Sequence, residues 1–105
     1  DATMEDAEYT GMSSITKVIS NEYKAPSTIP YKSGKIFQSY FEEADLIISK
    51  GQGNLEGLLP LNDGRIFYLL MVKCFVIAEF LKVKKDSFVV YNPASGVNNS
   101  DNVVA

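Results

Sequence analysis

The sequence predicts an α/β layered fold with a largely parallel sheet, and three observations predict it. Short apolar or β-branched runs of strand length alternate along the chain with segments whose apolar residues fall at helical spacing. The run Leu46-Ile47-Ile48 is apolar throughout, which is typical of a strand in a sheet covered on both faces. The chain has 105 residues, which is enough for one domain and too few for two.

The N-terminal third predicts a helix, a strand and a loop. Residues 3–10 favour a short helix, because Thr3 can cap its start, acids crowd its first turn and Gly11 can end it. Residues 15–19 alternate and are β-branched, which predicts a strand. Residues 20–30 contain two prolines, which predicts a loop.

The middle of the chain predicts a helix, a strand and a second helix. Residues 34–44 carry apolar side chains at helical spacing, which predicts an amphipathic helix. Residues 45–49 then predict a strand. Residues 54–59 predict a short helix that stops near Pro60, and residues 61–64 predict a turn.

The C-terminal third predicts two more strands around a short helix. Residues 66–72 are apolar over a length that favours a strand, residues 76–81 favour a short helix, and residues 88–91 favour a final strand. From Asn92 the chain is rich in Asn, Ser and Gly, so we expect residues 92–105 to be a flexible polar tail.

Composition excludes several classes of function. The chain has no His, which excludes His-based catalysis and His metal ligands, and its only cysteine, Cys74, excludes an internal disulfide and a cysteine metal cluster. It has no basic block, so we expect no nucleic-acid partner. Its longest apolar run, residues 66–72, is far shorter than the ~20 residues of a membrane helix, and no signal peptide is visible. We therefore expect a cytoplasmic protein without a membrane partner.

The segment Lys50-Gly51-Gln52-Gly53-Asn54 is the main candidate site. In open α/β sheets, ligands bind beyond the carboxyl ends of the strands, and this segment follows a predicted strand. Gly51 and Gly53 would let backbone N–H groups approach an anion, and Lys50 would add a point charge suited to phosphate. The spacing is neither a Walker A loop nor a dinucleotide fingerprint. It fits a phosphate cradle, and it also fits a tight turn with a solvated Lys50.

Two further residues are weaker candidates. Ser20 follows the strand predicted over residues 15–19 and could hydrogen-bond a polar ligand, although such groups more often only shape a loop. Asp1 carries a carboxylate of the kind that binds Mg²⁺ or Mn²⁺. One carboxylate at a chain terminus is normally solvated, so the residue types alone give no metal site.

Two stretches carry a resemblance to a known family. "ADLIISKGQGNLEGL" and the downstream "IFYLLMVKCFVIAEFLKVKKDSFVV" resemble the C-terminal part of the metal-dependent damage-control phosphatases, long catalogued only as a domain of unknown function. The upstream "DATMEDAEYTGMSSITKVISNEYKAPST" fits the same family in order and spacing. The resemblance covers Asp1 to about Tyr91, and the Lys-Gly-Gln-Gly-Asn loop is its most specific element.

The resemblance implies a three-layer α/β/α fold, of which residues 1–91 would be the C-terminal part. It also implies a divalent metal, such as Mg, Mn, Co or Ni, and hydrolysis of phosphate esters such as sugar phosphates or damaged phosphometabolites. Asp1 matches one family metal ligand, an Asp that precedes a Thr-containing helix. Lys50 matches the lysine that contacts the substrate phosphate and would be catalytic.

The resemblance also implies that something is missing. The other family ligands are an adjacent Asp-Asn pair before the residue matched by Asp1, and no residue of this chain precedes Asp1. Asp101-Asn102 has the same two residue types, but it follows Asp1 instead of preceding it, so we do not assign it this role. We therefore expect an upstream segment or chain to supply the pair, and we expect these 105 residues alone to be inactive.

Three hypotheses follow for function. The first is a metal-dependent phosphatase, or a fragment of one, that acts on a small phosphorylated metabolite. The alternative is a non-catalytic α/β module that binds such a metabolite through Lys50, Gly51, Gly53, Asn54 and Ser20. The third is a methyltransferase-type activity, proposed for one branch of the family, but no glycine-rich cofactor loop follows the first predicted strand.

Overall fold

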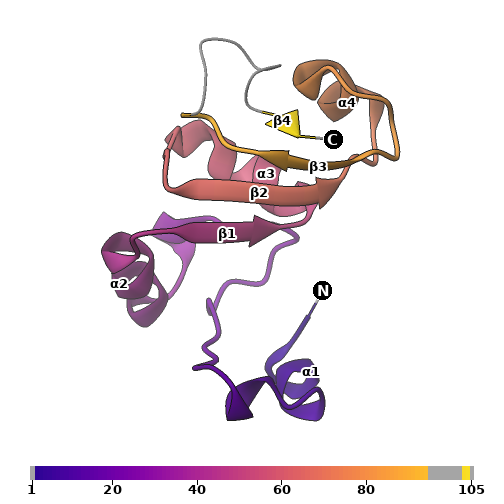
Figure 1. Cartoon of the computed structure of the whole chain (residues 1–105). Helices are drawn as coiled ribbons and strands as arrows, with labels where there is room; N and C mark the ends of the chain where they lie inside the picture. The colour runs from indigo at the N-terminus through magenta and orange to yellow at the C-terminus, as the bar shows by residue number, and fades with distance from the viewer. Residues whose placement is uncertain (1, 95–102, 105) are drawn as a thin grey trace.

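The computed structural model describes residues 2–94 and 103–104, and it confirms the α/β class (Figure 1). Its centre is a sheet in which the strands are neighbours in the order of the chain. The strands are β1 (Ile47–Lys50), β2 (Ile66–Met71), β3 (Phe88–Tyr91) and β4 (Val103–Val104).

The sheet contains the expected parallel pair and extends it with antiparallel strands. β1 and β2 are parallel, with Ile47 opposite Ile66, because the intervening helix α3 (Gln52–Leu58) carries the chain back to the starting edge. β2 and β3 are antiparallel, as are β3 and β4. The described sheet is therefore mixed.

The antiparallel pairing of β2 and β3 has a visible cause at their connection. The N–H of Val72 donates to the carbonyl of Ser87 at 2.9 Å, and the N–H of Asp86 donates to the carbonyl of Val72 at 2.7 Å. These bonds join the end of β2 to the start of β3 as in a hairpin. Helix α4 (Phe75–Leu81) is thus an insertion within a long hairpin connection.

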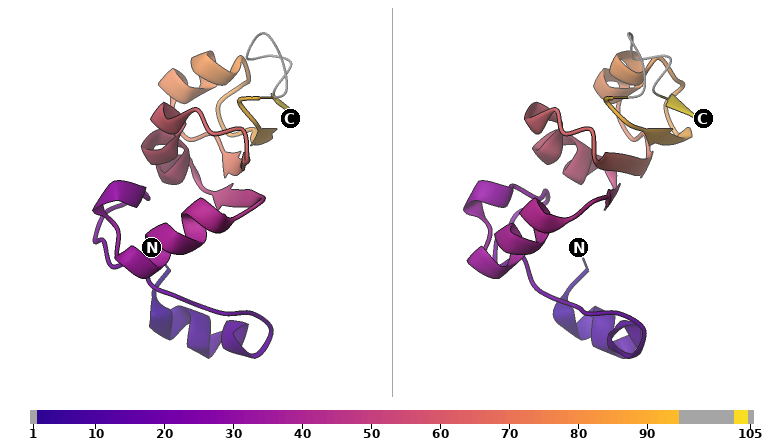
Figure 2. Two further views of the ribbon diagram at one scale, coloured as in Figure 1. Left: turned by 90° about the vertical axis from the view of Figure 1, so that its left-hand side faces the viewer. Right: turned by 60° about the vertical axis from the view of Figure 1, so that its left-hand side comes forward.

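The first predicted helix is present as α1 (Met4–Tyr9). Its start is a capping box, in which the N–H of Asp6 donates to Thr3 Oγ1 at 3.3 Å and the N–H of Thr3 donates to Asp6 Oδ2 at 2.8 Å. The helix buries none of its residues, and both views of Figure 2 show it set apart from the sheet.

The prediction of a strand over residues 15–19 is wrong. A 3₁₀ turn, η1 (Met12–Ser14), is followed by a chain that reaches residue 20 without ladder hydrogen bonds. Ile15 is 78% exposed. Alternating β-branched residues favour an extended backbone, but a strand also needs a hydrogen-bonded neighbour, and the described residues provide none here. Val18 and Ile19 nevertheless line a cavity together with Ile47 of β1.

The remaining helices agree with their predictions to within two residues at each end. α2 (Lys35–Glu43) occupies the predicted amphipathic segment, α3 begins at Gln52 instead of residue 54, and α4 begins at Phe75 instead of residue 76. Two short 3₁₀ turns, η2 (Pro30–Lys32) and η3 (Leu59–Leu61), complete the described helices. No helix in the described part of the chain has the length and hydropathy of a membrane span.

The core lies between one face of the sheet and helices α3 and α4. Along β2, alternate residues are buried, which places one face of the strand inward. The opposite face is open in the described residues: Ile48 is 60% exposed and Phe88 is 75% exposed. The fully or nearly fully buried apolar residues are Leu55, Leu58, Ile66, Tyr68, Leu70, Val72, Ile77, Ala78, Leu81, Val89 and Tyr91.

The segment expected to be a tail contains two ordered features. The Asn92 side chain is buried and its Nδ2 donates to the carbonyls of Gly64 at 2.9 Å and Ile66 at 2.8 Å. Val103–Val104 forms β4 and pairs with β3. Residues 95–102 and 105 lie outside the described part of the chain.

Candidate active site at the end of β1

The parallel pairing of β1 and β2 brings two lysines to one edge of the sheet. Lys50 ends β1, and Lys73 comes shortly after β2, so both lie at the carboxyl ends of parallel strands. A cavity of about 1350 Å³ opens at this edge, and we call it the lysine cleft. Its lining consists of residues 2–4, 20–28 and 50–54 together with Glu56 and Lys73.

A second cavity continues from the lysine cleft onto apolar surface. It has a volume of about 680 Å³ and shares Ser20, Lys50 and Asn54 with the lysine cleft. Phe37 and Tyr40 of α2 are among its apolar walls. A phosphorylated ligand could therefore place its charge at the lysines and its apolar part against α2.

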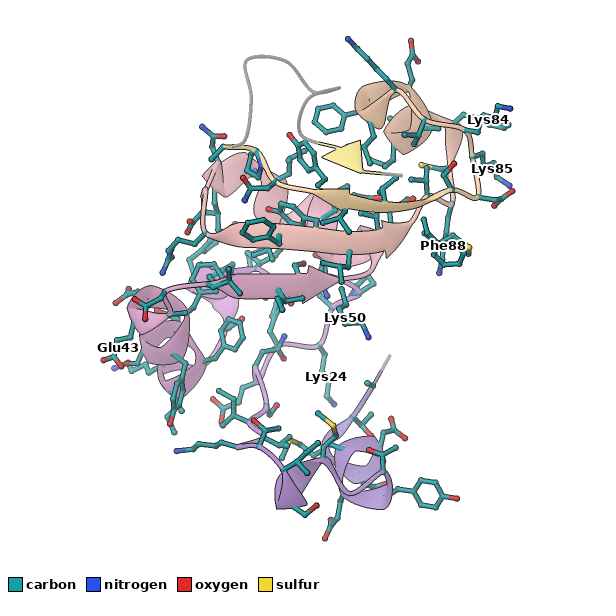
Figure 3. The ribbon with its side chains drawn as sticks, in the orientation of Figure 1. Lys24, Glu43, Lys50, Lys84, Lys85 and Phe88 are labelled. Atoms are coloured by element: carbon teal, nitrogen blue, oxygen red, sulfur yellow. The ribbon has the colours of Figure 1, made fainter. Side chains whose placement is uncertain are left out.

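Lys50 lines both cavities with an exposed side chain. Within residues 2–94 and 103–104, no carboxylate lies within 4.0 Å of its ammonium group. Figure 3 shows the side chain leaving the end of β1 on the side of the sheet that faces α1. Its charge is thus available to a ligand in the cleft.

Gly51 serves the turn and does not offer a free N–H group. Its φ is 95°, a conformation that residues with a Cβ rarely adopt. Its N–H donates to the carbonyl of Leu69 at 2.9 Å, which continues the ladder between β1 and β2. The expectation that this N–H binds an anion is therefore corrected.

Gly53 is required by a close approach of two segments. A Cβ at Gly53 would collide with the carbonyl oxygen of Pro26. A Cβ at Gly57, one turn further along α3, would lie 2.7 Å from both Ser27 Oγ and the carbonyl of Thr28. The glycines of α3 thus let the loop of residues 26–28 pack directly on the helix.

Asn54 ties that loop to the end of β1. Its Nδ2 donates to the carbonyl of Lys50 at 2.8 Å, and its Oδ1 accepts from the N–H and the hydroxyl of Thr28, each at 2.9 Å. The amide is therefore already engaged on both sides. Its observed role is to hold the two walls of the cleft together.

Ser20 lies in a loop, and the strand predicted before it is absent. It lines both cavities with Lys50. Its Oγ accepts from the N–H of Glu22 at 3.0 Å, so the hydroxyl hydrogen can still be donated to a ligand. Glu22 has a φ of 56°, which shows how sharply the chain turns after Ser20.

The proposed metal ligand Asp1 lies outside the described residues, as does Asp101-Asn102. The next residues, Ala2 and Thr3, line the lysine cleft. Among the described residues, no group of three or more Asp, Glu, His or Cys side chains could hold a metal ion. The described residues therefore do not form a complete metal site by themselves.

The sequence analysis missed Lys73 and the residue that fixes its backbone. The N–H of Lys73 donates to Gln52 Oε1 at 2.7 Å, and Gln52 Nε2 donates to Glu56 Oε1 at 2.9 Å and to Cys74 Sγ at 3.4 Å. Lys73 could have been predicted, because it directly follows the strand predicted over residues 66–72. Gln52 had no such signal, because its partners are distant in sequence.

Comparisons with known proteins agree with this architecture. The family model of the damage-control phosphatase ARMT1-like domain matches residues 1–89. This chain belongs to that family. The match covers Lys50, Lys73 and all three segments that line the lysine cleft.

Two archaeal relatives and one solved structure support the assignment. The chain is 44% identical over 90 residues to damage-control phosphatase PH1575 of Pyrococcus horikoshii and 40% identical over 86 residues to the uncharacterized protein MJ0202 of Methanocaldococcus jannaschii. These matches cover 85% and 79% of this chain. The crystal structure of PH1575, described as a DUF89 family protein, superposes with a TM-score of 0.79 at 42% identity over 84% of this chain.

The chain spans only part of these relatives. The matches cover 31% of PH1575, in sequence and in structure, and 28% of MJ0202.

Proposed function

We propose that this chain is part of a phosphatase that hydrolyses phosphate esters of small metabolites, including sugar phosphates and damaged phosphometabolites. Membership of the damage-control phosphatase family supports a phosphatase-type function. The observation that carries the proposal is that Lys50, which has no carboxylate within 4.0 Å among the described residues, lines the cleft at the carboxyl end of β1. An ammonium group at this place suits a phosphoryl group in transfer.

Three residues would contact the phosphate and two would hold the cleft in shape. Lys50 would offset charge on the phosphoryl oxygens, and the hydroxyl of Ser20 and the N–H of Gly53 would donate hydrogen bonds. Gly51 would contribute by turning the backbone after β1, and Asn54 by its hydrogen bonds to Thr28 and to the carbonyl of Lys50.

The reaction would depend on a divalent metal, of the Mg, Mn, Co or Ni class. Its ligands would be Asp1 and an Asp-Asn pair supplied by a segment upstream of this chain. A metal in such a place lowers the pKa of water and offsets phosphoryl charge. Because the described residues do not form a complete metal site, we assign no step of the reaction to the metal.

A second candidate function is binding without hydrolysis. It is favoured by one observation: Lys24, Lys50 and Lys73 line the cleft and offer cations to a phosphate. In both cases we propose a cytoplasmic location, with which the free thiol of the half-buried Cys74 is compatible.

A chelator separates the two candidates. A polypeptide that carries this chain and the upstream Asp-Asn pair would be assayed with an aryl phosphate and with sugar phosphates, before and after EDTA. A phosphatase loses turnover with EDTA and regains it with added metal. A binding module shows no turnover in either state, while its affinity for the sugar phosphate persists in EDTA.

A further inference from the structure

We propose that the lysine cleft recognises ligands with two separate anionic groups, and that Lys24 binds the second one. The second group is a phosphate or a carboxylate at the end of the ligand remote from Lys50. This inference rests on the proposed function only in assigning the first phosphate to Lys50. Lys24 belongs to the same cleft but comes from a different segment, residues 20–28.

The backbone around Lys24 is held in place by local hydrogen bonds. The N–H of Tyr23 donates to Asn21 Oδ1 at 3.2 Å, and the N–H of Ala25 donates to the carbonyl of Tyr23 at 3.1 Å. The carbonyl of Asn21 accepts from the N–H of Gly34 at 2.9 Å, which ties the segment to the start of α2. Lys24 is thus presented from a fixed turn.

The far end of the same segment is fixed to the Lys50 side of the cleft. Asn54 joins Thr28 to the carbonyl of Lys50, and Gly53 lets Pro26 pack against α3. The backbones of Lys24 and Lys50 are therefore both fixed within the lining of one cavity. This fixed spacing lowers the ordering cost of binding a ligand that spans both.

The charges that face Lys24 are mostly cationic. The lysine cleft contains Lys24, Lys50 and Lys73 against two acids, Glu22 and Glu56. Glu56 accepts from Gln52, and the carboxylate of Glu22 lies so close to Gly34 that a Cβ there would collide with it. Within the described residues, none of the three ammonium groups has a carboxylate within 4.0 Å.

Two separated cations suit two anions better than one. Figure 3 shows Lys24 and Lys50 at separate places between β1 and α1, with Lys24 extending toward the N-terminal segment. The cleft volume of about 1350 Å³ exceeds the roughly 300–1000 Å³ of ordinary small-molecule pockets, so a ligand longer than one phosphate group fits. In a chain of net charge −3, such a local surplus of lysines also attracts anions selectively.

Titration calorimetry on this chain in metal-free buffer tests the proposal with a matched ligand set. The probes are glucose 6-phosphate, 6-phosphogluconate and glucose 1,6-bisphosphate. Glucose 6-phosphate has one anionic group, and the other two probes have two each. We expect at least one of the two probes with a second anionic group to bind about tenfold more tightly than glucose 6-phosphate, as a charge-assisted contact would provide. Tighter binding of 6-phosphogluconate alone identifies the second anion as a carboxylate, and tighter binding of glucose 1,6-bisphosphate alone identifies it as a phosphate. Tighter binding of both shows that the site accepts either group.

Three variants assign the gain to a residue. Lys24→Gln should remove the advantage of the probe with a second anionic group and leave the affinity for glucose 6-phosphate unchanged. Lys84→Gln removes one positive charge outside the cleft, on the exposed α4–β3 connection, and should change neither affinity. Lys50→Gln should weaken all probes together.

The outcomes separate this inference from the proposed function. If Lys24→Gln keeps the preference for probes with two anionic groups, or if neither of these probes binds more tightly than glucose 6-phosphate, the inference is overturned. If Lys24→Gln removes the preference while Lys50→Gln has no effect, the second-anion site stands and the role of Lys50 fails. Circular dichroism of each variant confirms that the fold is retained.

Discussion

Lys50 is the residue on which the proposed chemistry depends most. It combines exposure, absence of a carboxylate partner among the described residues, and a place at the carboxyl end of β1. Its backbone is held by Asn54, and the next residue turns the chain with a positive φ. The side chain is therefore free while its origin is fixed, as a phosphate-binding lysine requires.

Replacing Lys50 should reduce phosphatase activity without unfolding the chain. In a polypeptide that carries the complete proposed ligand set, we expect Lys50→Ala to lower kcat/KM by roughly ten- to a hundredfold, or more if the contact strengthens in the transition state. The control is Lys84→Ala, which should leave kcat/KM unchanged. An equal loss in both variants would show that net charge matters and that Lys50 has no special role.

Tyr68 offers a test of packing inside the core. Among the described residues, its buried hydroxyl has no hydrogen-bond partner, and the same holds for the hydroxyl of Ser49. Burial raises the pKa of Tyr68 to about 12. Its ring stacks on Tyr91 with centroids 6.0 Å apart. Tyr68→Phe keeps the ring and removes an unsatisfied group, so the free energy of unfolding should stay within ~0.5 kcal/mol or rise.

Urea unfolding measures this effect, and Tyr91→Phe is the matched ring variant. A loss of more than ~1 kcal/mol in Tyr68→Phe would show that the hydroxyl has a partner.

Among the elements, α2 is tied to the sheet by one arginine. Arg65 Nη1 donates to the carbonyls of Phe41 at 3.0 Å, Glu42 at 3.1 Å and Ala44 at 2.7 Å, which are among the last carbonyls of the helix. Its Nη2 forms an ion pair with Asp63 at 2.7 Å. Carbonyls at a helix C-terminus lack intrahelical partners, so this side chain caps the helix and anchors it at the start of β2.

Loss of that cap should destabilise the protein. We expect Arg65→Ala to lower the free energy of unfolding by about 1–3 kcal/mol, because charge-assisted bonds to half-buried carbonyls are lost. Lys85→Ala is the control, since its ion pair with Asp86 at 3.3 Å is exposed and should contribute less than ~0.5 kcal/mol. Urea unfolding measures the stability of both variants, compared by their midpoint concentrations when the dependence of the unfolding free energy on urea is unchanged. Similar losses in the two variants would contradict the capping role.

The same ion pair predicts an acid-sensitive part of stability. Hydrogen bonds from Arg65 hold the pKa of Asp63 below its ordinary value of 3.8. A carboxyl with a lowered folded-state pKa stabilises the fold above the unfolded value, and this stabilisation disappears as the pH falls through the folded value. As the pH falls from 5 to 3, the free energy of unfolding should therefore decrease less in Asp63→Asn than in the unaltered chain.

Chemical unfolding at pH 5, 4 and 3 would show this, with the exposed Asp86→Asn as control. If the free energy of unfolding changed with pH in the same way in Asp63→Asn and in the unaltered chain, Asp63 would not contribute to the acid sensitivity.

The elements also show how far the sequence alone could lead. Helical spacing located α2, the Thr3 cap with the acids of the first turn and Gly11 located α1, and the apolar runs located β1 and β2. The predicted strand over residues 15–19 failed, because pairing depends on a neighbour that local pattern cannot show.

The candidate site was predictable only in part, for a similar reason. The position of Lys50 followed from the rule for strand ends. The reason for Gly53 did not, because the carbonyl of Pro26 that requires it lies far away in sequence. Likewise, nothing in the local pattern showed that Asn54 would bond Thr28 and the carbonyl of Lys50.

At the scale of the whole molecule, one face of the sheet is uncovered in the described residues. Ile48, Phe67, Phe88 and Val90 lie on that face and are all exposed by a third or more. The amphipathic helix α2 also leaves Ile36 66% exposed. Contiguous apolar surface of this kind normally packs against another layer. The expected three-layer arrangement, and relatives about three times longer, suit a covering layer from outside this chain.

The uncovered face should make the isolated chain associate with itself. We expect Phe88→Ser to reduce concentration-dependent association and dye binding to apolar surface, because it removes the most exposed large side chain of this face. Tyr9→Ser is the control, since Tyr9 is 92% exposed on α1, away from the sheet. Sedimentation at several concentrations provides the measurement. Unchanged association in Phe88→Ser would show that this face is not the contact.

We propose that this chain holds the phosphate-binding part of a metal-dependent phosphatase whose other metal ligands lie upstream. The direct measurement compares two proteins: the 105 residues alone, and the same residues preceded by a segment that carries the Asp-Asn pair. Each is assayed with an aryl phosphate and sugar phosphates in Co²⁺, Ni²⁺, Mn²⁺ or Mg²⁺. We predict metal-dependent turnover only in the extended protein, because Asp1 alone leaves most positions around such a metal without protein ligands. Metal-dependent turnover by the 105 residues alone, or none by the extended protein, would contradict the account.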